Sequence, residues 1–482
     1  MPVPTLREIS DRGKRCTRVP VGDVPCAKLS DLIPAEHLRD APPRLPEVSE
    51  PELARHYAAL ARDTYSIDGG FYPLGSCTMK YNPKVNDRVA ALPGWALVHP
   101  ETPAEQVQGA LRLIWELERW LAALGGMEAA SLQPPAGAAG EFCCLRMFRG
   151  YHESRGEGRR RRVIVPDSAH GTNPASVARC GYTAVAIRST GGRVDLGELQ
   201  RALGDDVAAV MLTNPNTLGL FETDILRIVE MVHGAGALLY YDGANMNAIM
   251  GYARPGDMGF DAMHFNLHKT FSTPHGGGGP GAGPVAAQAH LAAFLPVPRV
   301  VEQQGVYAWH WDYPQSIGRV HSYCGNFLVA VRAYAYILAH GAEGLQGVSE
   351  AAVLNANYVA QGLREVYDFP YEGPYMHECV LSAQSLYRDT GVRALDVAKR
   401  LLDHGLHPPT IYFPLIVKEA LMVEPTETES KETLDRFVEV MGAIAREAHE
   451  APEVLHAAPH HSPVRRVDEL TAARHPRLKW DE

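Results

Sequence analysis

Lys269 stands at an unusual place for a surface charge. It follows a semi-apolar, strand-like run at residues 261–267 and precedes a run of glycines at 276–283. A lysine amine that is kept from water can act as a nucleophile toward a carbonyl compound. The position therefore predicts a buried amine held close to a bulky ligand.

Polar side chains of complementary chemistry follow the predicted strands of the same region. In open α/β sheets the ligand lies beyond the carboxyl ends of the strands, so these residues are expected to share one rim. They are His170, Thr213, Asn214, Asp242, Asn266 and His268. The loop at 134–140 lacks large side chains and opens a predicted helix, and a helix start is suited to bind a phosphate group.

Together these groups have the chemistry of a pyridoxal phosphate site. Lys269 offers an amine that condenses with an aldehyde, Asp242 a carboxylate that keeps a pyridine nitrogen protonated, and His170 a flat ring. Each residue alone has a simpler interpretation, since a strand-end aspartate often caps a helix and single histidines and lysines are common in turns. Their combination favours the cofactor.

Two other ligand classes are weakly indicated. The glycine run contains the spacing G-x-G-x-x-G, but Pro280 interrupts it and no convincing helix follows, so close backbone approach to a ring or a neighbouring subunit explains it better than a dinucleotide. His377 and Glu378 begin like an H-E-x-x-H zinc motif, but Leu381 stands where the second histidine belongs. We expect no metal.

The order of predicted elements indicates an α/β fold. Between residues 163 and 241, apolar strands without a polar face alternate with helices, a pattern typical of a mainly parallel sheet covered by helices on both sides. An amphipathic helix at 327–340 then leads into weaker α+β signals. We expect three parts: an extended arm with short helices at 1–88, a large cofactor-binding α/β domain at 89–325, and a smaller α+β domain with a tail at 326–482.

Composition limits the partners and the compartment. The chain has 482 residues and a formal net charge of -10, which argues against a nucleic-acid-binding face. No apolar stretch approaches the roughly 20 residues of a membrane span, and the N-terminal residues lack the pattern of a secretion signal. The eight cysteines are dispersed, as in a reducing compartment. We expect a cytoplasmic protein that binds neither nucleic acid nor membrane.

Several segments resemble the glycine decarboxylase P-protein of the glycine cleavage system. The likeness runs from about residue 60 to residue 425, and the length matches the second, C-terminal-half subunit of the split form. The segments that carry the resemblance are YPLGSCTMK at 72–80, QPPAGAAGE at 133–141, DSAHGTNPA at 167–175, DGAN at 242–245, NLHKT at 266–270, HGGGGP at 275–280 and MHE at 376–378.

The resemblance implies a fold and a set of cofactor-binding residues. The fold would be that of the fold type I, aspartate aminotransferase-like enzymes, with pyridoxal 5'-phosphate attached to Lys269. Asp242 would pair with the pyridine nitrogen, and Ala244 and His170 would lie on opposite faces of the ring. The other implied cofactor contacts are Gly137, Ala138, Ala139, His268 and Asn214. Pro135 and Ala136 depart from the more polar dipeptide expected there, which leaves open which groups of the loop meet the phosphate.

The resemblance also implies an activity and partners. A glycine dehydrogenase (aminomethyl-transferring) releases CO2 from glycine and passes the aminomethyl group to the lipoyl disulfide of the H-protein. The implied partners are glycine, the lipoylated H-protein and a first P-protein subunit, in a heterotetramer with two copies of each subunit.

Three questions stay open at this stage. The chain could be another fold type I enzyme, such as a cysteine desulfurase or an amino-acid decarboxylase, although the 72–80 segment and the glycine run speak against it. It could be a scaffold subunit without catalysis, although a scaffold has no need of Lys269. Cys77 could meet the lipoyl sulfur, although a small buried residue in a turn is the favoured interpretation.

Overall fold

The computed structural model describes residues 3–18, 20, 22–41, 43–276 and 281–478. The chain forms two compact units, Phe71–Ala458 and a second one made of Met1–Gly70 with Pro459–Glu482. The domain boundaries expected at 88/89 and 325/326 both fall inside the first unit. The predicted role of glycines 277–279 lies outside the described residues.

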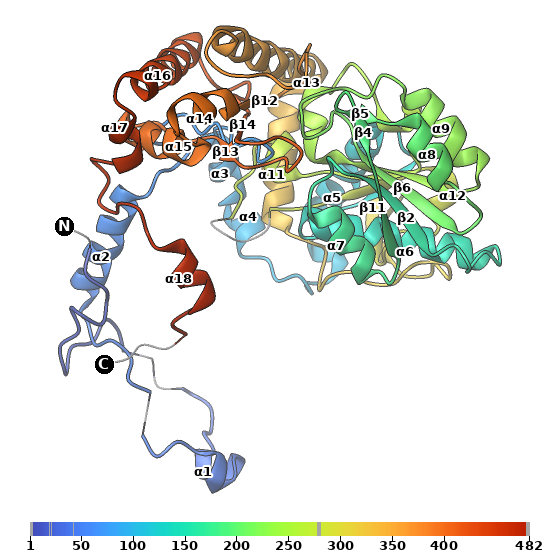
Figure 1. Ribbon diagram of the computed structural model, residues 1–482. Coiled ribbons are helices and arrows are strands. Elements are labelled where there is room, and N and C mark those ends of the chain that lie inside the picture. The colour runs from blue at the N-terminus through green and yellow to red at the C-terminus, as the bar shows by residue number, and fades with distance from the viewer. Residues whose placement is uncertain (1–2, 19, 21, 42, 277–280, 479–482) are drawn as a thin grey trace. The chain divides into compact units, whose positions relative to one another are not determined.

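A seven-stranded sheet forms the centre of the Phe71–Ala458 unit (Figure 1). Its strand order is β1-β9-β8-β7-β6-β2-β3, in which β8, β7, β6, β2 and β3 run parallel and β9 is antiparallel to both β8 and β1. The strands are β1 (Ala129–Ser131), β2 (Arg162–Pro166), β3 (Thr183–Ile187), β6 (Val207–Thr213), β7 (Leu238–Asp242), β8 (Ala262–His264) and β9 (Val285–Ala287). The sheet confirms the predicted α/β class with mainly parallel strands.

Both faces of this sheet are apolar because helices cover both. On one face Ile164, Val210 and Tyr241 belong to a core cluster with residues of α5 (Gln108–Gly125), α8 (Leu196–Ala202) and α9 (Ile225–Gly234). On the other, Val163, Met211 and Tyr240 pack with α6 (Gly137–Ser154) and α7 (Thr172–Arg179). Successive strand residues point to opposite faces, so burial on both faces gives the continuous apolar runs seen in the sequence.

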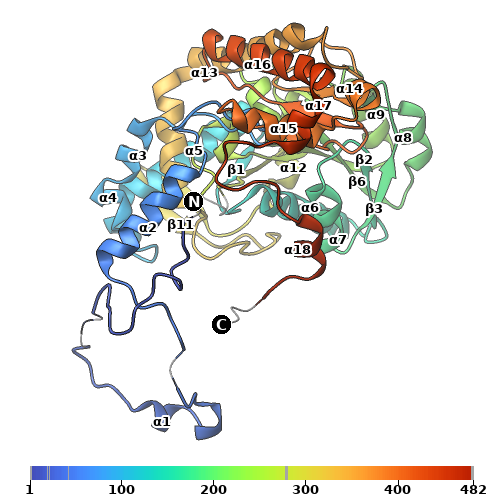
Figure 2. The same ribbon diagram turned by 60° about the vertical axis from the view of Figure 1, so that its left-hand side comes forward.

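A second sheet is built from the C-terminal part of the same unit. β14 (Ala420–Val423) is its central strand, antiparallel to β12 (Cys379–Ser382) and to β13 (Thr410–Ile411). Figures 1 and 2 show helices packed around it. They are α13 (Phe327–Leu363), α14 (Gln384–Thr390), α15 (Ala394–Asp403), α16 (Lys431–Glu450) and α17 (Pro452–Ala457).

Shorter elements complete the unit. Two hairpins lie outside the main sheet: β4 (Ser189–Thr190) with β5 (Arg193–Val194), and β10 (Arg299–Gln303) with β11 (Val306–His310). The short helices are α3 (Lys84–Ala90), α4 (Pro93–Ala96), η2 (Ala104–Gln106), η3 (Gly243–Ala248), α10 (Pro255–Met258), α11 (Leu267–Thr270) and α12 (Ala289–Ala292).

The other unit contains four helices among its described residues. They are α1 (Leu29–Leu32), η1 (Ala35–His37), α2 (Glu50–Asp63) and α18 (Glu469–Arg474). Ser49 and Glu52 form a capping box at the start of α2, and Lys14 pairs with Glu52 at 2.6 Å. Val48 and Pro459 are the buried residues of the described part of this unit, so it has little apolar core of its own.

Most predicted elements are present, and three differences have a local cause. α6 begins at Gly137 rather than at 141, because the small residues of its first turn carry no apolar periodicity. The helix that begins at Phe327 continues to Leu363 through a kink at Gly341, whose φ is 61°. β1 and β9 went unpredicted because three residues are too few to show a period. β8 covers Ala262–His264, within the strand-like run expected at 261–267.

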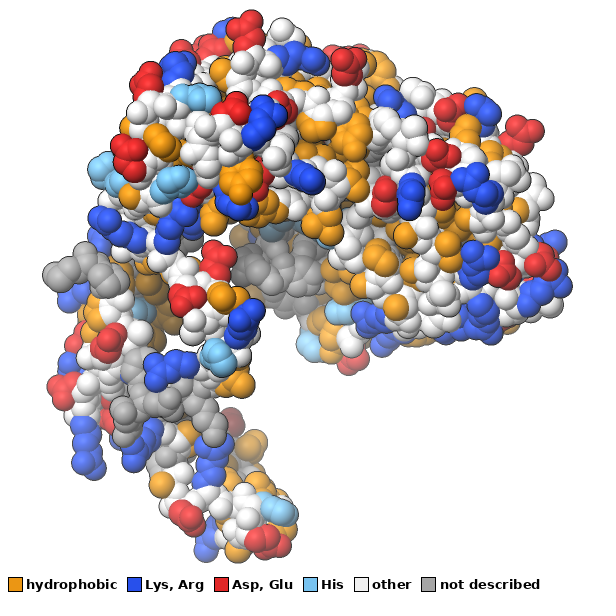
Figure 3. Space-filling model, viewed as in Figure 1, with side chains coloured by type: hydrophobic (Ala, Val, Ile, Leu, Met, Phe, Trp, Pro, Cys, Tyr) orange, Lys and Arg blue, Asp and Glu red, His pale blue; other side chains and the backbone are white. Residues whose placement is uncertain are grey.

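The surface carries charges of both signs. Lysine, arginine, aspartate and glutamate side chains are interspersed over the face of the Phe71–Ala458 unit that Figure 3 shows. Exposed ion pairs such as Arg201 with Glu198 contribute little to stability because water screens them. Among the described residues, no helix combines the length and the apolar character that crossing a membrane requires.

Candidate active site

Lys269 lies in a pocket at the carboxyl ends of the parallel strands. β8 ends at His264, and the chain turns directly into α11, which carries Lys269. The amine Nζ donates a hydrogen bond of 2.8 Å to the main-chain oxygen of Ser76. The pocket has a volume of about 190 Å³. Its wall is formed by Ser76, Gly137, Ala138, Glu141, His170, Thr172, Thr213, Thr217, Asp242, Ala244, Asn245, His264, Asn266, His268 and Lys269.

Asp242 enters the pocket from the end of β7, the strand beside β8. The residue is 3% exposed, and its carboxylate accepts hydrogen bonds from Asn173 Nδ2 at 3.0 Å and from the Ala244 main-chain N–H at 3.0 Å. His264 Nε2 lies 3.6 Å from Oδ1, the oxygen that also accepts from Ala244 N. Burial raises the pKa of Asp242, but His264 and the two donors outweigh it and hold the pKa below its usual value. Asp242 is therefore a buried carboxylate that stays ionised at neutral pH.

The start of α6 forms the opposite wall. Gly140 N donates to Ala136 O, so the N–H groups of residues 137–139 belong to the first turn, which has no helical acceptor for them. A Cβ on Gly137 would lie 2.5 Å from Asn266 Nδ2, and one on Gly283 would lie 2.0 Å from Ala136 O. Glycine is needed at both positions because neighbouring segments approach the helix start this closely.

A hydrogen-bonded chain fixes His170 at the pocket. His170 Nδ1 lies 3.0 Å from Thr172 Oγ1, which in turn donates to Glu141 Oε1 at 2.7 Å. Burial and then the charge of Lys269 lower the pKa of His170, so its ring is neutral at neutral pH. Burial and then the charge of Asp242 raise the pKa of Glu141. The arrangement presents a neutral, oriented imidazole to the pocket.

Two further histidines stand beside Lys269. The rings of His268 and His275 meet edge to face with centroids 5.1 Å apart. Burial lowers the pKa of His268 to about 3 and that of His275 to about 4, with the charge of Lys269 adding to both. Both rings therefore remain neutral at physiological pH and can act as hydrogen-bonding groups rather than as cations.

The pocket brings together most of the residues predicted from the sequence. Those that line it are Gly137, Ala138, His170, Asp242, Ala244, His268 and Lys269. Ala139 lies in the first turn of α6, outside the lining. Asn214 is fully buried and is not among the residues that line the pocket. Its Oδ1 accepts from Glu222 N at 2.9 Å, because the loop after β6 needs this acceptor for its own turn.

Sequence reasoning missed several residues of the wall. Glu141, Thr172 and Ser76 all lie within segments that carry the family resemblance, so that signal could have pointed to them. His264 is the last residue of β8, and sequence reasoning looked for site residues only after the end of this strand. A resemblance over a whole segment does not tell which of its residues reach the pocket. The contacts in the structure show that.

Cys77 follows Ser76, whose main-chain carbonyl accepts a hydrogen bond from Lys269. Burial raises the pKa of the Cys77 thiol above its usual value, although the charge of Lys269 acts in the opposite direction. The thiolate is the reactive form of cysteine. A raised pKa favours the interpretation of Cys77 as a small residue within a tight loop.

Comparisons with known proteins agree with this geometry. Residues 348–465 match the family model described as glycine dehydrogenase, C-terminal domain. The chain is 56% identical over 476 residues to the probable glycine dehydrogenase (decarboxylating) subunit 2 of Thermotoga petrophila, covering 99% of each chain. It is also 56% identical to the protein of the same name from Caldanaerobacter subterraneus, covering 98% of each.

Solved structures share the fold. A crystal structure of glycine decarboxylase (P-protein) of the glycine cleavage system, in inhibitor-bound form, superposes with a TM-score of 0.73 at 23% identity, covering 87% of this chain and 95% of that one. A cysteine desulfurase from Thermococcus onnurineus gives a TM-score of 0.61 at 15% identity, covering 79% and 95%. The architecture is that of fold type I pyridoxal phosphate enzymes, and by its full-length identity to these relatives the chain belongs to the glycine dehydrogenase (decarboxylating) subunit 2 family.

Proposed function

We propose that this chain is the pyridoxal phosphate-carrying subunit of a glycine decarboxylase. It would release CO2 from glycine and pass the aminomethyl group to the lipoyl disulfide of an H-protein, together with a first subunit. The observation that carries the proposal is the meeting of Lys269, Asp242 and His170 with the start of α6 in one pocket. Membership of the subunit 2 family supports the substrate and the companion subunit.

The residues of the pocket fit the cofactor. A phosphate needs several N–H donors, and the start of α6 offers them beside glycines that leave room for a ligand. A pyridine nitrogen needs an ionised carboxylate, and Asp242 is one. An aldehyde needs an amine, and Lys269 is the lysine of the pocket wall. Asn173 Oδ1 and Asn245 Oδ1 are buried without a hydrogen-bond partner among the described residues, as polar atoms near a ligand site often are.

Each residue would have a defined role. When bound, pyridoxal phosphate supplies an electron sink for the electrons left on glycine as CO2 departs. Asp242 would keep a proton on the ring nitrogen, and Asn173 with the Ala244 N–H would keep Asp242 ionised. His170 would pack against the ring, oriented by Thr172 and Glu141.

The walls of the site suit a reaction in which a charged carboxylate becomes neutral CO2. Lys269 is the one lysine or arginine among the described residues that line the pocket. The neighbouring His170 and His268 are held neutral by burial. A carboxylate without a strong cationic partner is less stabilised before the bond breaks, and such an environment lowers the cost of losing the charge.

A lysine substitution tests the proposal. We expect the purified wild-type chain to carry the visible absorbance of lysine-bound pyridoxal phosphate and to gain the mass of the cofactor on borohydride reduction. Lys269→Ala should abolish both, whereas Lys418→Ala, at an exposed lysine, should change neither. Glycine-dependent CO2 exchange with lipoylated carrier, with and without the companion subunit, then measures the activity.

The alternatives give different results in the same experiment. A colourless wild-type chain whose mass borohydride leaves unchanged would identify a scaffold subunit. A coloured chain that releases sulfur from cysteine, or that decarboxylates another amino acid in place of glycine, would identify another fold type I enzyme.

A further inference from the structure

A buried cluster of His377, Glu378 and Glu424 is connected to Lys269 through the hydrogen bonds of Ser76. Cys379 of β12 pairs with Val423 of β14 in antiparallel register, so Glu378 and Glu424 follow as the next opposed positions. All three side chains are fully buried. None of them belongs to the pocket wall described above. A group of three buried titratable side chains needs a reason, because removing them from water is costly.

Both carboxyl groups bind the loop that carries Ser76. Ser76 N donates to Glu378 Oε2 at 2.7 Å. Thr78 N donates to Glu424 Oε2 at 2.9 Å, and Thr78 Oγ1 donates to Glu424 Oε1 at 2.5 Å. The two carboxyl groups thus hold residues 76 and 78 of one tight loop.

The same loop has an unfavourable backbone. Ser76 has a φ of 64° and Thr78 a φ of 49°, in the left-handed region that residues other than glycine avoid. Such conformations persist only where the surroundings enforce them, and they concentrate at functional sites. The hydrogen bonds that Ser76 and Thr78 donate to Glu378 and Glu424 hold the loop in this conformation.

The loop presents its carbonyl to the amine of the pocket. Lys269 Nζ donates to Ser76 O at 2.8 Å, and the N–H of the same residue is the group that Glu378 binds. A shift of the Glu378 side chain would therefore move the acceptor of Lys269. The cluster therefore helps to orient the amine of Lys269 through Ser76.

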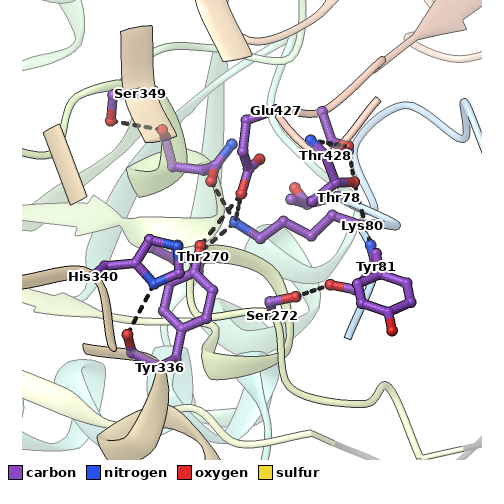
Figure 4. Close-up of polar contacts among 12 residues, drawn as sticks. Thr78, Lys80, Tyr81, Thr270, Ser272, Tyr336, His340, Ser349, Glu427 and Thr428 are labelled. Atoms are coloured by element: carbon purple, nitrogen blue, oxygen red, sulfur yellow. Dashed lines mark hydrogen bonds and ion pairs between the residues drawn. The ribbon is translucent and has the colours of Figure 1, made fainter. Parts of the chain in front are cut away.

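Lys80 anchors the far end of the loop (Figure 4). Its Nζ donates to Glu427 Oε1 at 2.6 Å, to Asn247 Oδ1 at 2.8 Å and to the carbonyl oxygen of Thr270 at 2.9 Å. Thr270 is the neighbour of Lys269 in α11. The loop is therefore held at both ends by hydrogen bonds to α11, between Ser76 and Lys269 and between Lys80 and Thr270.

The hydrogen bonds indicate which carboxyl group of the cluster carries a proton. Both oxygens of Glu424 accept, which suits an ionised carboxylate. Glu378 accepts only at Oε2, and its Oε1 has no hydrogen-bond partner among the described residues. His377 Nε2 lies 3.6 Å from that oxygen. Glu378 Oε1 is thus the position at which a proton fits.

The charges around the pair agree with this assignment. Burial and then the charge of Glu424 raise the pKa of Glu378 well above its usual range, and burial raises that of Glu424 against the donors of Thr78. Burial lowers the pKa of His377 to about 3, so it adds no positive charge. The charged or titratable groups that face the pair are Lys269, Lys80, Cys77 and Cys379.

We propose that Glu378 and Glu424 hold a single proton between them at neutral pH, carried on Glu378, and that this pair positions the 76–78 loop against Lys269. The positioning role rests on the proposed function of Lys269, whereas the shared proton does not. The pair acts through Ser76, so neither glutamate needs to touch substrate or cofactor.

Infrared spectroscopy of the full-length chain tests the proton. A protonated carboxyl group has a C=O band separate from that of a carboxylate, and carbon-13 labelling of glutamate shifts it. Burial raises the pKa of Glu118 to about 8, so this group adds a band of its own. We expect the wild-type chain at pH 7 to show a further component of the band, which disappears as the pH rises and is absent from Glu378→Gln in the difference spectrum. Glu439→Gln, at an exposed position of α16, should retain it.

Two results would overturn the shared proton. One is a wild-type chain without this further component at pH 7, which needs no variant to fold. The other is a stoichiometric divalent metal ion found by elemental analysis of the purified chain, because the three side chains would then be metal ligands with both carboxylates ionised.

The positioning role predicts unequal effects of two matched variants. Glutamine at 424 cannot accept at both ends, so Glu424→Gln should lower kcat on the order of tenfold or more and shift the pH profile of borohydride trapping at Lys269. Glutamine at 378 can still accept from Ser76 N, so Glu378→Gln should cost less, and Glu424→Asp should recover part of the loss.

Equal losses in the two glutamine variants, or a wild-type trapping profile in Glu424→Gln, would contradict the positioning role. A wild-type chain that shows the further component of the carboxyl band but neither cofactor attachment nor CO2 exchange would contradict the proposed function and leave the shared proton established.

Discussion

At the scale of single residues, the surroundings of each titratable group in the pocket decide whether it is charged or neutral. Asp242 is ionised because His264, the Asn173 amide and the Ala244 N–H favour its charge more than burial disfavours it. Glu141 has the opposite balance and a raised pKa. His170 and His268 are neutral because burial outweighs their partners. Burial is thus common to all of them, and the specific donors decide which group keeps a charge.

Asp242 gives the clearest test at this scale. Asp242→Asn keeps the shape of the side chain and removes its charge. We expect kcat for glycine-dependent CO2 exchange to fall on the order of a hundredfold or more, because a preorganised charge beside the reacting system is lost. Cofactor attachment at Lys269 should persist, which absorbance and borohydride trapping would measure.

Asp389→Asn provides the matched control, since Asp389 is an exposed residue paired with Arg388. It should leave kcat unchanged. An Asp242→Asn enzyme with near wild-type kcat would show that the buried charge is not used in the reaction.

At the scale of elements, close contacts of loops with strand ends join the two sheets. Gly219 lies in the loop between β6 and α9, and its carbonyl accepts from Met376 N at 2.7 Å. A Cβ at this position would lie 1.8 Å from the main-chain oxygen of Glu378, which precedes β12. The contact places this loop of the main sheet directly against Glu378, immediately before β12.

Substitution of Gly219 should therefore be costly. Gly219 has a φ of 74°, and an added methyl group would overlap main-chain atoms that cannot move alone. We expect Gly219→Ala to lower the free energy of unfolding by about 2 kcal/mol or more. Chemical denaturation followed by circular dichroism measures the change.

Gly234 is the natural comparison. It ends α9, it is exposed, and a Cβ there would meet no atom within 4 Å. Gly234→Ala should stabilise the protein by up to about 1 kcal/mol because alanine has the higher helix propensity. Similar destabilisation by both substitutions would mean that the Glu378 contact is not what limits position 219.

At the scale of the whole molecule, the site belongs to one compact unit. Every residue of the pocket wall and of the Glu378–Glu424 cluster lies within Phe71–Ala458. The three apolar core clusters also lie within these residues. In the described part of the unit Met1–Gly70 with Pro459–Glu482, the buried residues are Val48 and Pro459. Folding of the site thus depends on the larger unit.

A shortened chain tests this independence. We expect residues 71–458 to fold cooperatively and to attach pyridoxal phosphate at Lys269, because an apolar core of this size is sufficient for a stable domain. Circular dichroism on heating and borohydride trapping measure the two properties. An unfolded product, or a folded one that fails to attach the cofactor, would show that the terminal segments complete the unit.

The sequence alone determined the α/β class, the reactive lysine and the acid, histidine and helix start around it, because these depend on local periodicity and on the rule that parallel strands end at one rim. Tertiary structure decided that Asn214 accepts a hydrogen bond from Glu222 N and that Ser76 and Glu378, 302 positions apart, are hydrogen bonded. Antiparallel register sets Glu378 opposite Glu424. Such pairing depends on which strands lie side by side, and local patterns carry no information about that.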